Sequence, residues 1–322
     1  MNFNPQLMKR NEKGNKGTFG RVLIIAGSVN MSGCVYLSSI GAFRSGCGLV
    51  NIFTDVSNIS SLKILIPEAL FDFFNSTKHP VIDEANPSYM KRLDYLLKKA
   101  DSVVIGPGLG VNDDTYNLVE YVLKNCDKNL VLDADALNVI STKFKMKDML
   151  NEDSKADENH PLYNVGKNRT LVITPHIGEL SRLTGDTVEN IKEHVDDYAL
   201  NIAKKYGIIA VIKDYSTRVS DGVDLYSNKS GNSSLATAGS GDILSGMIAS
   251  LLIPDEYKFR AVNTAVYLHG KAGELAGKDV TTYSCMARDI VDAIPKAFAS
   301  LKVDDRIYNN CVILEVMNGS SK

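Results

Sequence analysis

The chain has 322 residues, of which 44% are hydrophobic and 23% charged, and its net charge is −2. These proportions are ordinary for a globular protein with a large core, and the lack of a basic excess argues against a nucleic-acid partner. No stretch approaches the roughly 20 apolar residues of a membrane span, and the N-terminus has no signal-peptide core. The five cysteines are widely spaced without a C-x-x-C pair, which favours reduced thiols. We therefore expect a cytoplasmic protein without a membrane partner.

Short apolar runs alternate with amphipathic stretches along most of the chain. The runs are rich in β-branched residues and apolar throughout, as in strands that helices cover on both faces. This alternation predicts an α/β fold with a mostly parallel central sheet and helices on both faces. The expected strands are 22–26, 49–53, 103–105, 130–132, 171–173 and 208–212, and the expected helices are 33–44, 88–99, 115–125 and 187–205.

The pattern changes after the last of these strands. Residues 217–226 predict a β-hairpin whose turn is Asp221-Gly222. From residue 241 to residue 299 the pattern is almost entirely helical. The sequence therefore predicts helices rather than further strands after the hairpin.

No internal repeat or interdomain linker interrupts the chain, which predicts one domain over 1–317. Residues 142–169 form a polar and aperiodic segment, so we expect a surface insertion with some disorder there. Residues 318–322 are expected to form a loose tail. Neither segment suggests a chemical role.

The most informative segment is 235–246 (LATAGSGDILSG), in which Gly239, Ser240 and Gly241 precede Asp242 and an apolar helical run follows. The N-terminus of such a helix presents unpaired N–H groups and the positive end of its dipole, which favours bound phosphate. An aspartate would repel that phosphate, so its presence there indicates a function. One such function is to accept a proton from a hydroxyl that attacks phosphorus. Turn and capping chemistry explains the same residues, and the segment alone leaves both interpretations open.

Other unusual residues follow the predicted strands, and in α/β sheets ligands bind at the carboxyl ends of the strands. The small residues of 27–34 and the glycines of 106–110 would let a ligand approach the backbone, although plain tight turns have the same composition. Asp133 and Asp135 would hold Mg²⁺ through water or hydrogen-bond a ligand amide, unless Asp135 caps a short helix.

His176 and Lys213 also stand at the ends of predicted strands. His176 would meet a ligand there, although a lone histidine is more often structural. Lys213 would balance phosphate charge or simply face solvent. His269, inside a helical run, fits a structural role better. Because unrelated turns would scatter over both edges of the sheet, the shared placement of these loops favours one ligand site.

Eight segments share their order with one known family: NKGTFG (15–20), GSVNMSG (27–33), AFRSGCGLV (42–50), IGPGLG (105–110), LDADALN (132–138), ITPHIGEL (173–180), ATAGSGDILSGMIASLL (236–252) and AVYLHGKAGELA (265–276). In this order they resemble the ADP/ATP-dependent NAD(P)H-hydrate dehydratases of the ribokinase-like superfamily. The resemblance covers about 16–299 apart from the polar insertion. The order is specific, whereas the GSGD loop by itself occurs in many small-molecule kinases.

The resemblance implies a ribokinase-like, three-layer α/β/α fold and an activity in nicotinamide cofactor repair. That activity is the ADP- or ATP-dependent dehydration of the S epimer of hydrated NADH or NADPH, with Mg²⁺. The ring hydroxyl would be phosphorylated and phosphate then eliminated. A homo-oligomer such as a tetramer is also implied. Many bacterial relatives carry a fused epimerase domain, and this chain is expected to rely on a separate NAD(P)H-hydrate epimerase instead.

The resemblance also assigns roles to residues, although it names no metal ligand. It implies that Asp242 is the acidic residue at the reacting centre, where it also contacts the substrate, and that an anion hole precedes it. The anion hole would consist of Gly239, Ser240 and Gly241. The nucleotide would contact Lys213, Asp214, Tyr215, Ser216, Thr217 and Gly241. The substrate would contact Cys34, Gly108, His176 and Asp242.

Two residues depart from the family pattern. Asp214 replaces the usual glycine after Lys213, which adds negative charge and bulk near the nucleotide. Cys34 stands where the family usually has alanine, which is tolerable if that contact runs through the backbone. Asp214 is therefore the departure that would change nucleotide preference or affinity.

Two other functions remain open from the sequence. The first is a small-molecule kinase of the same superfamily, acting on a vitamin precursor or sugar alcohol and leaving its phosphate on the product. The second is a nucleotide-binding or sensing protein without catalysis, against which Asp242 argues because a pure binder gains nothing from an acid beside phosphate.

Overall fold

The computed structural model describes residues 10–301 except 78–79, 152, 164 and 166–168. Its strands form one sheet in the order β3-β2-β1-β4-β5-β6-β7-β8-β9. Strands β1 to β7 are parallel, and β8 and β9 run antiparallel to their neighbours. The strands are β1 (Arg21–Ile25), β2 (Leu49–Asp55), β3 (Leu70–Phe74), β4 (Ser102–Ile105), β5 (Asn129–Leu132), β6 (Leu171–Ile173), β7 (Ile209–Ile212), β8 (Arg218–Ser220) and β9 (Leu225–Ser227).

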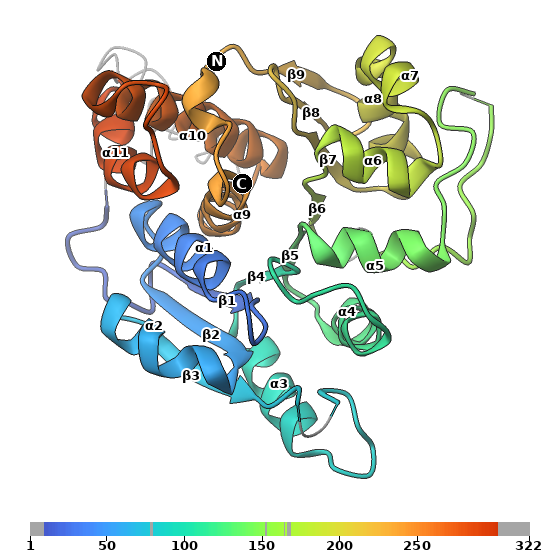
Figure 1. Ribbon diagram of the computed structural model, residues 1–322. Coiled ribbons are helices and arrows are strands. Elements are labelled where there is room, and N and C mark those ends of the chain that lie inside the picture. Colours follow the sequence, from blue (N-terminus) through green and yellow to red (C-terminus); the bar gives the residue numbers. More distant parts are fainter. Residues whose placement is uncertain (1–9, 78–79, 152, 164, 166–168, 302–322) are drawn as a thin grey trace, which may run out of the picture.

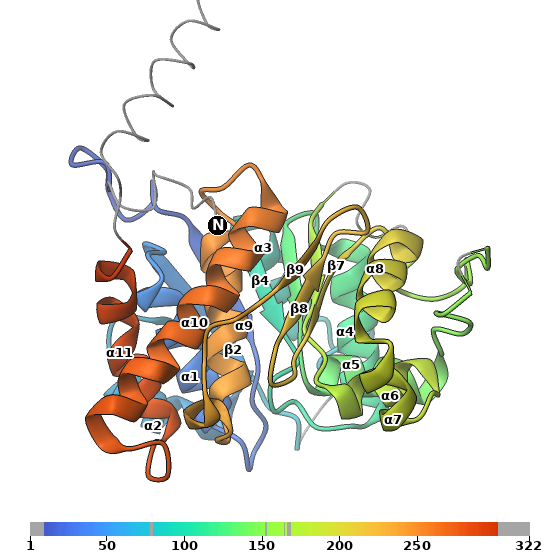
Figure 2. The same ribbon diagram turned by 90° about the horizontal axis from the view of Figure 1, so that it is seen from above.

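Helices cover both faces of this sheet, and Figures 1 and 2 show the resulting three layers. One face carries α1 (Gly33–Arg44), α2 (Ile59–Leu65), α9 (Ser240–Leu251), α10 (Lys258–Val280) and α11 (Ala287–Ala299). The other carries α3 (Ser88–Lys99), α4 (Asp113–Asn125), α5 (Asp135–Lys143), α6 (Ile177–Thr184), α7 (Val188–Glu193) and α8 (Val195–Tyr206). The predicted layered α/β fold is confirmed.

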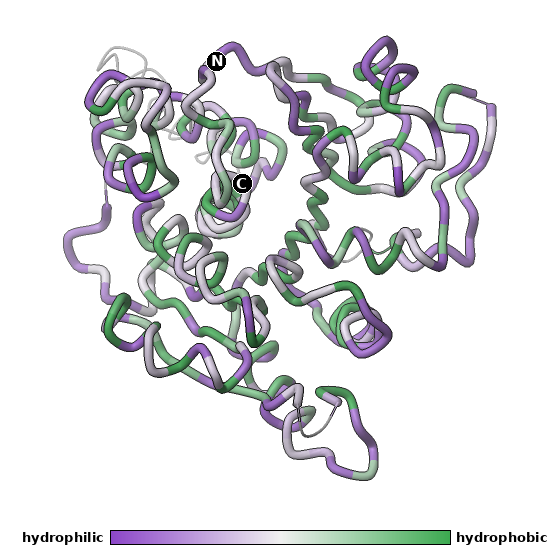
Figure 3. The backbone as a smooth tube through the Cα atoms, viewed as in Figure 1, coloured by the Kyte–Doolittle hydropathy of each residue, from purple (hydrophilic) through white to green (hydrophobic). Residues whose placement is uncertain are grey.

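The core consists of two apolar layers that the sheet separates. In β1, Leu23 and Ile25 pack into one layer while Val22 and Ile24 pack into the other, and all four are fully buried. Side chains alternate across a strand, so a strand buried on both faces must be apolar at every position. The central strands accordingly appear as continuous hydrophobic segments in Figure 3.

Most expected elements are present to within a residue or two, including the hairpin of β8 and β9 and the helices after it. The single helix expected over 187–205 is wrong, because His194, with φ −122° and ψ 28°, breaks it into α7 and α8. Strand β3 was not expected either. It lies at one edge of the sheet, and only Phe74 of its five residues is buried, so it lacks the uniformly apolar pattern.

The polar segment 142–169 packs against the core more than its composition indicates. Met146, Met149 and Leu162 are each at most 1% exposed and belong to the layer under α5 and α8. The side chain of Asn201 on α8 donates to the backbone oxygen of Met149 at 2.7 Å. A few apolar side chains therefore anchor this otherwise polar segment to the hydrophobic core. The tail expected at 318–322 lies outside the described residues.

Helices α1 and α9 approach each other closely through glycine. A Cβ on Gly41 would lie 2.5 Å from the backbone oxygen of Ile243, and one on Gly246 would lie 2.0 Å from that of Ser38. Both distances are too short for any side chain, so glycine permits this packing. In the described part of the chain, no helix combines the length and the apolar character needed to cross a membrane.

Candidate active site

The loops that follow β1, β4, β5, β6 and β7 meet at the carboxyl edge of the sheet, as the parallel strands require. The chain after β6 continues alongside the chain after β7, where His176 and Lys213 form a parallel bridge. The backbone N–H of Lys213 donates to Pro175 O at 2.8 Å. A Cβ on Gly241 would lie 3.3 Å from Lys213 Nζ and 3.9 Å from Asp133 Oδ2. The strand-end loops and the start of α9 therefore form one site.

The start of α9 has the open geometry of an anion-binding helix terminus. Gly239 is its N-cap with φ +91°, a conformation that glycine adopts without strain, and no side chain caps the helix. A Cβ on Gly239 would also lie 2.2 Å from a methyl group of Leu37. Ser240 N donates to Thr237 O at 3.3 Å, whereas the N–H groups of Gly241 and Asp242 have no backbone partner among the described residues. These two groups are left for a ligand, with the positive end of the helix dipole behind them.

Asp242 lies in the first turn of α9 and forms no ion pair with the described residues. Burial, together with the negative charge of Asp133, raises the pKa of Asp242 to about 7, even though Lys213 acts in the opposite direction. A carboxyl group with such a pKa accepts a proton readily near neutral pH. This property matches a general base better than a helix cap.

Lys213 is held between two buried carboxylates. Its Nζ lies 2.8 Å from Asp133 Oδ1 and 4.0 Å from Glu179 Oε2. Burial acts to lower the pKa of Lys213, but the two carboxylates outweigh it and raise that pKa above its usual value. Lys213 is therefore a fixed positive charge next to the start of α9, not the solvent-facing side chain that the sequence left open.

Cys34 and Gly108 are in contact, as expected of two residues on one ligand surface. Gly108 has φ +65°, and a Cβ there would lie 2.4 Å from Cys34 Sγ. Cys34 Sγ lies 3.3 Å from the backbone oxygens of both Met31 and Pro107. Burial and the charge of Asp242 raise the pKa of Cys34 to about 12, so the thiol stays protonated. The larger side chain at position 34 thus fills space beside the glycine-rich loop.

Asp135 holds the glycine-rich loop and does not cap a helix. It is the first residue of α5, whose N-cap Ala134 makes no side-chain capping bond. Asp135 Oδ2 accepts a hydrogen bond from Gly110 N at 2.8 Å, and Oδ1 accepts one from Asn138 Nδ2 at 3.3 Å. The capping interpretation of Asp135 is therefore wrong, since its carboxylate fixes the loop that contains Gly108.

His176 has the structural role that the sequence left open. Its Nδ1 accepts hydrogen bonds from Gly178 N and Glu179 N, so the ring caps α6. Burial, Lys213 and Arg182 lower the pKa of His176, so the ring is neutral with its hydrogen on Nε2. Its side chain is 52% exposed. Nε2 lies 3.6 Å from Glu179 Oε1, which is beyond hydrogen-bond distance, so its N–H can still donate to a ligand while the ring stays in place.

A cavity of about 650 Å³ lies beside this cluster, between the loop after β7 and α10. Lys213, Asp214, Tyr215 and Thr217 all line it, and Tyr215 is 92% exposed. Ser216 differs, because its hydroxyl donates to Asn228 O at 2.9 Å within the hairpin. The structure thus brings four of the five residues of 213–217 to one cavity.

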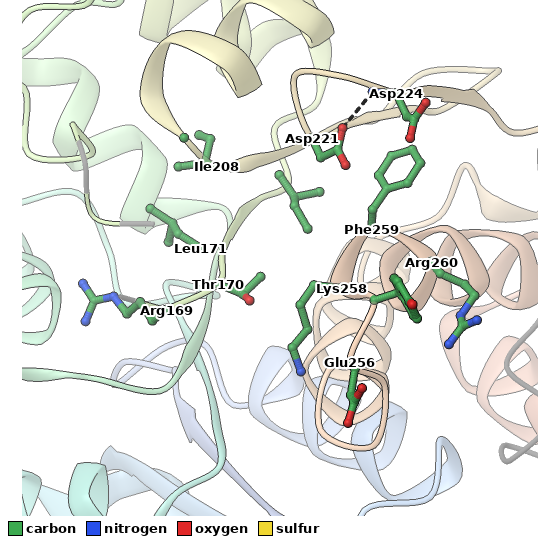
Figure 4. A pocket seen from close by; sticks show the side chains of 13 residues that line it. Arg169, Thr170, Leu171, Ile208, Asp221, Asp224, Glu256, Lys258, Phe259 and Arg260 are labelled. Atoms are coloured by element: carbon green, nitrogen blue, oxygen red, sulfur yellow. Dashed lines mark hydrogen bonds between the residues drawn. The ribbon is translucent and has the colours of Figure 1, made fainter. Parts of the chain in front are cut away.

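A second cavity, of about 730 Å³, lies at the opposite, amino edge of the sheet, where β6, β7 and α10 begin. Figure 4 shows its lining, with the carboxylates of Asp221 and Asp224 on one side and Lys258 and Glu256 below Phe259. No residue with an expected role lines it. The residues to which the sequence assigns roles therefore lie at the carboxyl edge of the sheet.

Sequence reasoning missed two residues of the site. Glu179 received no role, although the spacing of His176 and Glu179 matches the capping box that both form at the start of α6. His269 was interpreted as structural, yet its Nε2 lies 3.2 Å from Ser240 Oγ. No sequence signal marks that contact, because the two residues are on different helices.

Comparisons with known proteins agree with this geometry. A family model described as NAD(P)H-hydrate dehydratase matches residues 22–296. The chain is 31% identical to an ADP-dependent (S)-NAD(P)H-hydrate dehydratase from Staphylococcus aureus, covering 91% of this chain and 94% of that protein. It resembles the crystal structure of the ADP/ATP-dependent NAD(P)H-hydrate dehydratase from Bacillus subtilis, co-crystallised with ATP and Mg²⁺, with a TM-score of 0.73 and 28% identity over 91% and 94% of the two chains.

Some similar proteins are longer. A bifunctional NAD(P)H-hydrate repair enzyme from Thermofilum pendens is 31% identical over 90% of this chain, which spans only 52% of that protein. The chain therefore corresponds to about half of the bifunctional relatives and to nearly all of the single-function ones.

Proposed function

The chain belongs to the NAD(P)H-hydrate dehydratase family, and on that premise we propose that it uses ADP or ATP to return the S epimer of hydrated NADH or NADPH to NAD(P)H. The observation that carries this proposal is the position of Asp242, a carboxylate that forms no ion pair with any described residue and lies in the first turn of a helix whose N-terminus is open to phosphate. A lyase that passes through a phosphorylated intermediate needs these two features side by side.

The chemistry follows from the substrate. Hydroxide is a poor leaving group, so the ring hydroxyl of the hydrate must first be converted into a better one. Asp242 accepts the hydroxyl proton as the oxygen bonds to the terminal phosphorus of the nucleotide, and the bond from that phosphorus to the nucleotide breaks. The ring nitrogen then expels phosphate, and loss of a proton from the neighbouring ring carbon restores the dihydronicotinamide. General-base help of this kind is typically worth about 10²- to 10⁴-fold.

The start of α9 and Lys213 bear the charge of the transferred group. Gly241 N would donate to the bound phosphate together with Gly239 N, while Ser240, whose N–H is bonded to Thr237 O, would contribute its hydroxyl. Losing one such donor typically costs about 10²- to 10³-fold in rate. Lys213 adds a buried positive charge next to Gly241. The cavity that begins at Lys213 has room for the rest of the nucleotide.

Mg²⁺ fits the donor set beside Lys213. No cluster of three or more potential metal ligands exists within the described ranges, so an all-protein cage is absent there. Asp133 and Glu179 do place two buried carboxylates next to Lys213 Nζ. Mg²⁺ prefers one or two carboxylates together with water and substrate phosphates. Asp133 would hold the ion through its other oxygen, Oδ2, which lies toward Gly241, because Asp133 Oδ1 and Glu179 Oε2 face Lys213 Nζ. When bound, the ion supplies charge neutralisation for the nucleotide phosphates.

The nicotinamide ring of the substrate would lie on the side of Asp242 away from the nucleotide cavity. Gly108 and Cys34 form one contact surface there, and the N–H of His176 Nε2 is available to a carbonyl or phosphate oxygen. Asp135 keeps the Gly108 loop in position through Gly110. The site thus has separate places for the ring and for the nucleotide, with the base between them.

The direct test is an incubation of the protein with hydrated NADH or NADPH, Mg²⁺ and either ADP or ATP. Recovery of absorbance in the reduced-nicotinamide band is expected, with release of phosphate. Asp242→Asn should still bind nucleotide yet lose nearly all turnover, whereas Asp221→Asn at the opposite edge serves as a matched acid control. Failure to restore any hydrate, or near-normal turnover in Asp242→Asn, would contradict the proposal.

The same assay separates the two other functions. A small-molecule kinase would leave a phosphorylated product that persists, and a nucleotide sensor would bind ADP or ATP without turning over any hydrate. The eight family segments and the open carboxylate of Asp242 support the dehydratase over both.

We further propose a cytoplasmic protein that acts after a separate epimerase and forms a homo-oligomer. The reduced thiols Cys34, Cys47, Cys126 and Cys285 support the compartment. Bifunctional relatives that unite hydrate-repair activities in one chain support the epimerase partner. Exposed apolar residues near the open sheet edge support the assembly: Ile64, Leu65, Leu70 and Phe73.

A further inference from the structure

His269 connects α10 to the start of α9. The residue is 7% exposed, and its Nε2 lies 3.2 Å from Ser240 Oγ. Ser240 is the first residue of α9 and lies between Gly239 and Gly241 in the open helix terminus. Across the described residues, His269 is the only side chain that hydrogen-bonds Ser240 Oγ. Ser240 is itself only 6% exposed, and a hydrogen bond between its backbone and the His269 ring also affects the pKa of His269, so the imidazole packs closely against this residue.

His269 is neutral at physiological pH. Burial lowers the pKa of His269 to about 4, and the positive charge of Lys213 acts in the same direction. A neutral imidazole carries one N–H and one acceptor nitrogen. In the tautomer with its hydrogen on Nε2, the ring donates to Ser240 Oγ, and the hydroxyl hydrogen is then free to point toward the phosphate position.

We propose that His269 is a positioning residue for phosphoryl transfer, which orients the Ser240 hydroxyl so that it donates to the transferred phosphoryl group. This inference rests on the proposed function and extends it to a residue outside the anion hole. Because His269 also lines the nucleotide cavity, it lies where the nucleotide and the transferred group meet. A preorganised donor at this place lowers the barrier, since it needs no reorientation during the reaction.

Filling of the core does not require a histidine at this position. The neighbouring buried residues of α10 are apolar, among them Val266, Leu268 and Ala272. Burying an imidazole costs desolvation free energy unless the ring is hydrogen-bonded, and a leucine would avoid that cost. The hydrogen bond to Ser240 offsets the desolvation cost of burying the imidazole.

A double-mutant cycle tests the proposal. His269→Leu and Ser240→Ala should each lower kcat for hydrate dehydration by about tenfold or more and raise the KM for the nucleotide by no more than about threefold. His269→Leu should cost less than about twofold in the Ser240→Ala background, because the hydroxyl that it orients is already gone. His269→Gln, which retains an N–H donor, should recover much of the activity. An equal loss in both backgrounds would overturn the proposal.

A matched control separates positioning from packing. Asn263 is also a buried polar residue of α10, and its Oδ1 has no hydrogen-bond partner in the described part of the chain. Asn263→Leu should leave kcat unchanged. If His269→Leu lowers kcat only as far as its fraction unfolded, measured by circular dichroism at the assay temperature, the role of His269 is purely structural and the proposal is wrong.

A binding measurement keeps this inference separate from the dehydratase proposal. If the wild-type protein turns over no hydrate, calorimetry with Mg-ATP and with adenosine replaces the rate. His269→Leu should weaken Mg-ATP binding by about two- to threefold and leave adenosine binding unchanged, whereas in the Ser240→Ala background it should weaken the binding of neither ligand. Equal weakening of both ligands, or no weakening of either, would overturn the role of His269.

Discussion

At the scale of single residues, Asp242 works because its surroundings disfavour its charge. Its carboxylate lies near other buried acids and forms no ion pair with the described residues, while Lys213 is committed to Asp133 and Glu179. The protein thus keeps the proton affinity of Asp242 high and still holds a positive charge for phosphate a few ångströms away. A direct ion pair between Asp242 and Lys213 would have removed both advantages.

The first prediction concerns the pH dependence of the rate. Because the active form is the carboxylate and the pKa of Asp242 is about 7, kcat/KM should rise across neutral pH with a midpoint near 7. Steady-state assays from pH 5.5 to 9 measure it. Asp242→Asn should show a small residual rate without that rise. A wild-type profile that is flat through pH 7 would show that Asp242 does not limit the reaction.

The second prediction is the effect of the same group on stability. The folded pKa of Asp242 is above its unfolded value, so the folded state holds an extra proton between about pH 4 and pH 7. This contribution to the free energy of unfolding is present below pH 4 and is lost as the pH rises to 7. Asp242→Asn should therefore gain stability over the wild type from pH 4 to pH 8 in urea titrations. An equal difference at both pH values would contradict this sign.

The third prediction concerns Asp214, which lines the nucleotide cavity next to Lys213. A carboxylate there repels nucleotide phosphates, and at a partly exposed position the repulsion is worth about 1 kcal/mol or less. Asp214→Gly should lower the KM for ADP or ATP by about two- to fivefold, with a smaller effect at 0.5 M salt. An unchanged KM at low salt would show that Asp214 does not face the phosphates.

At the scale of elements, the contact between α1 and α9 sets the position of the reacting centre. Gly41 and Gly246 let the two backbones meet, and Gly239 turns the chain into α9 against Leu37. Cys34 on α1 and Asp242 on α9 thereby face the same loop. A substitution in the interface between α1 and α9 should therefore displace the anion hole, even though the substituted residue is not part of it.

The fourth prediction uses that contact. Gly41→Ala would bring a methyl group within 2.5 Å of Ile243 O, so it should cost about 1–3 kcal/mol in the free energy of unfolding and also lower kcat. Gly33→Ala on the same helix has no heavy atom within 4 Å of the new Cβ and should leave that free energy nearly unchanged. Urea denaturation of both variants measures the difference. Equal stability of the two would mean that α1 and α9 can move apart freely.

The elements themselves were largely predictable from sequence, and the exceptions have physical causes. Parallel strands buried on both faces must be apolar, so β1 and β4 to β7 are visible as short apolar runs. Strand β3 is an edge strand that contains Asp72 and lacks that constraint. The break between α7 and α8 depends on the backbone conformation of His194, which the hydrophobic pattern of the sequence does not predict.

At the scale of the whole molecule, the location of the site was predictable but its pairings were not. The rule that ligands gather at the carboxyl ends of strands placed Asp133, His176 and Lys213 at one edge correctly. Which of them would pair depends on tertiary geometry. The Lys213 ion pairs and the bond between His269 and Ser240 join residues 29 to 80 positions apart. Local sequence carries no information about such distances.

The fifth prediction concerns assembly. Phe73 on the edge strand β3 is 51% exposed, next to an open row of backbone groups that a second copy could extend. Phe73→Lys should shift the mass measured by light scattering toward the 35.2 kDa of one chain. Val223→Lys, at an 86% exposed position in the hairpin turn, should not. An unchanged mass for Phe73→Lys would place the interface elsewhere.

The glycine contact between α1 and α9 has one more consequence. Because the backbones of α1 and α9 touch at Gly41 and Gly246, neither helix can shift without the other. Asp242 on α9 and Cys34 on α1 therefore keep a fixed position relative to each other, so the base stays in register with the thiol beside Gly108.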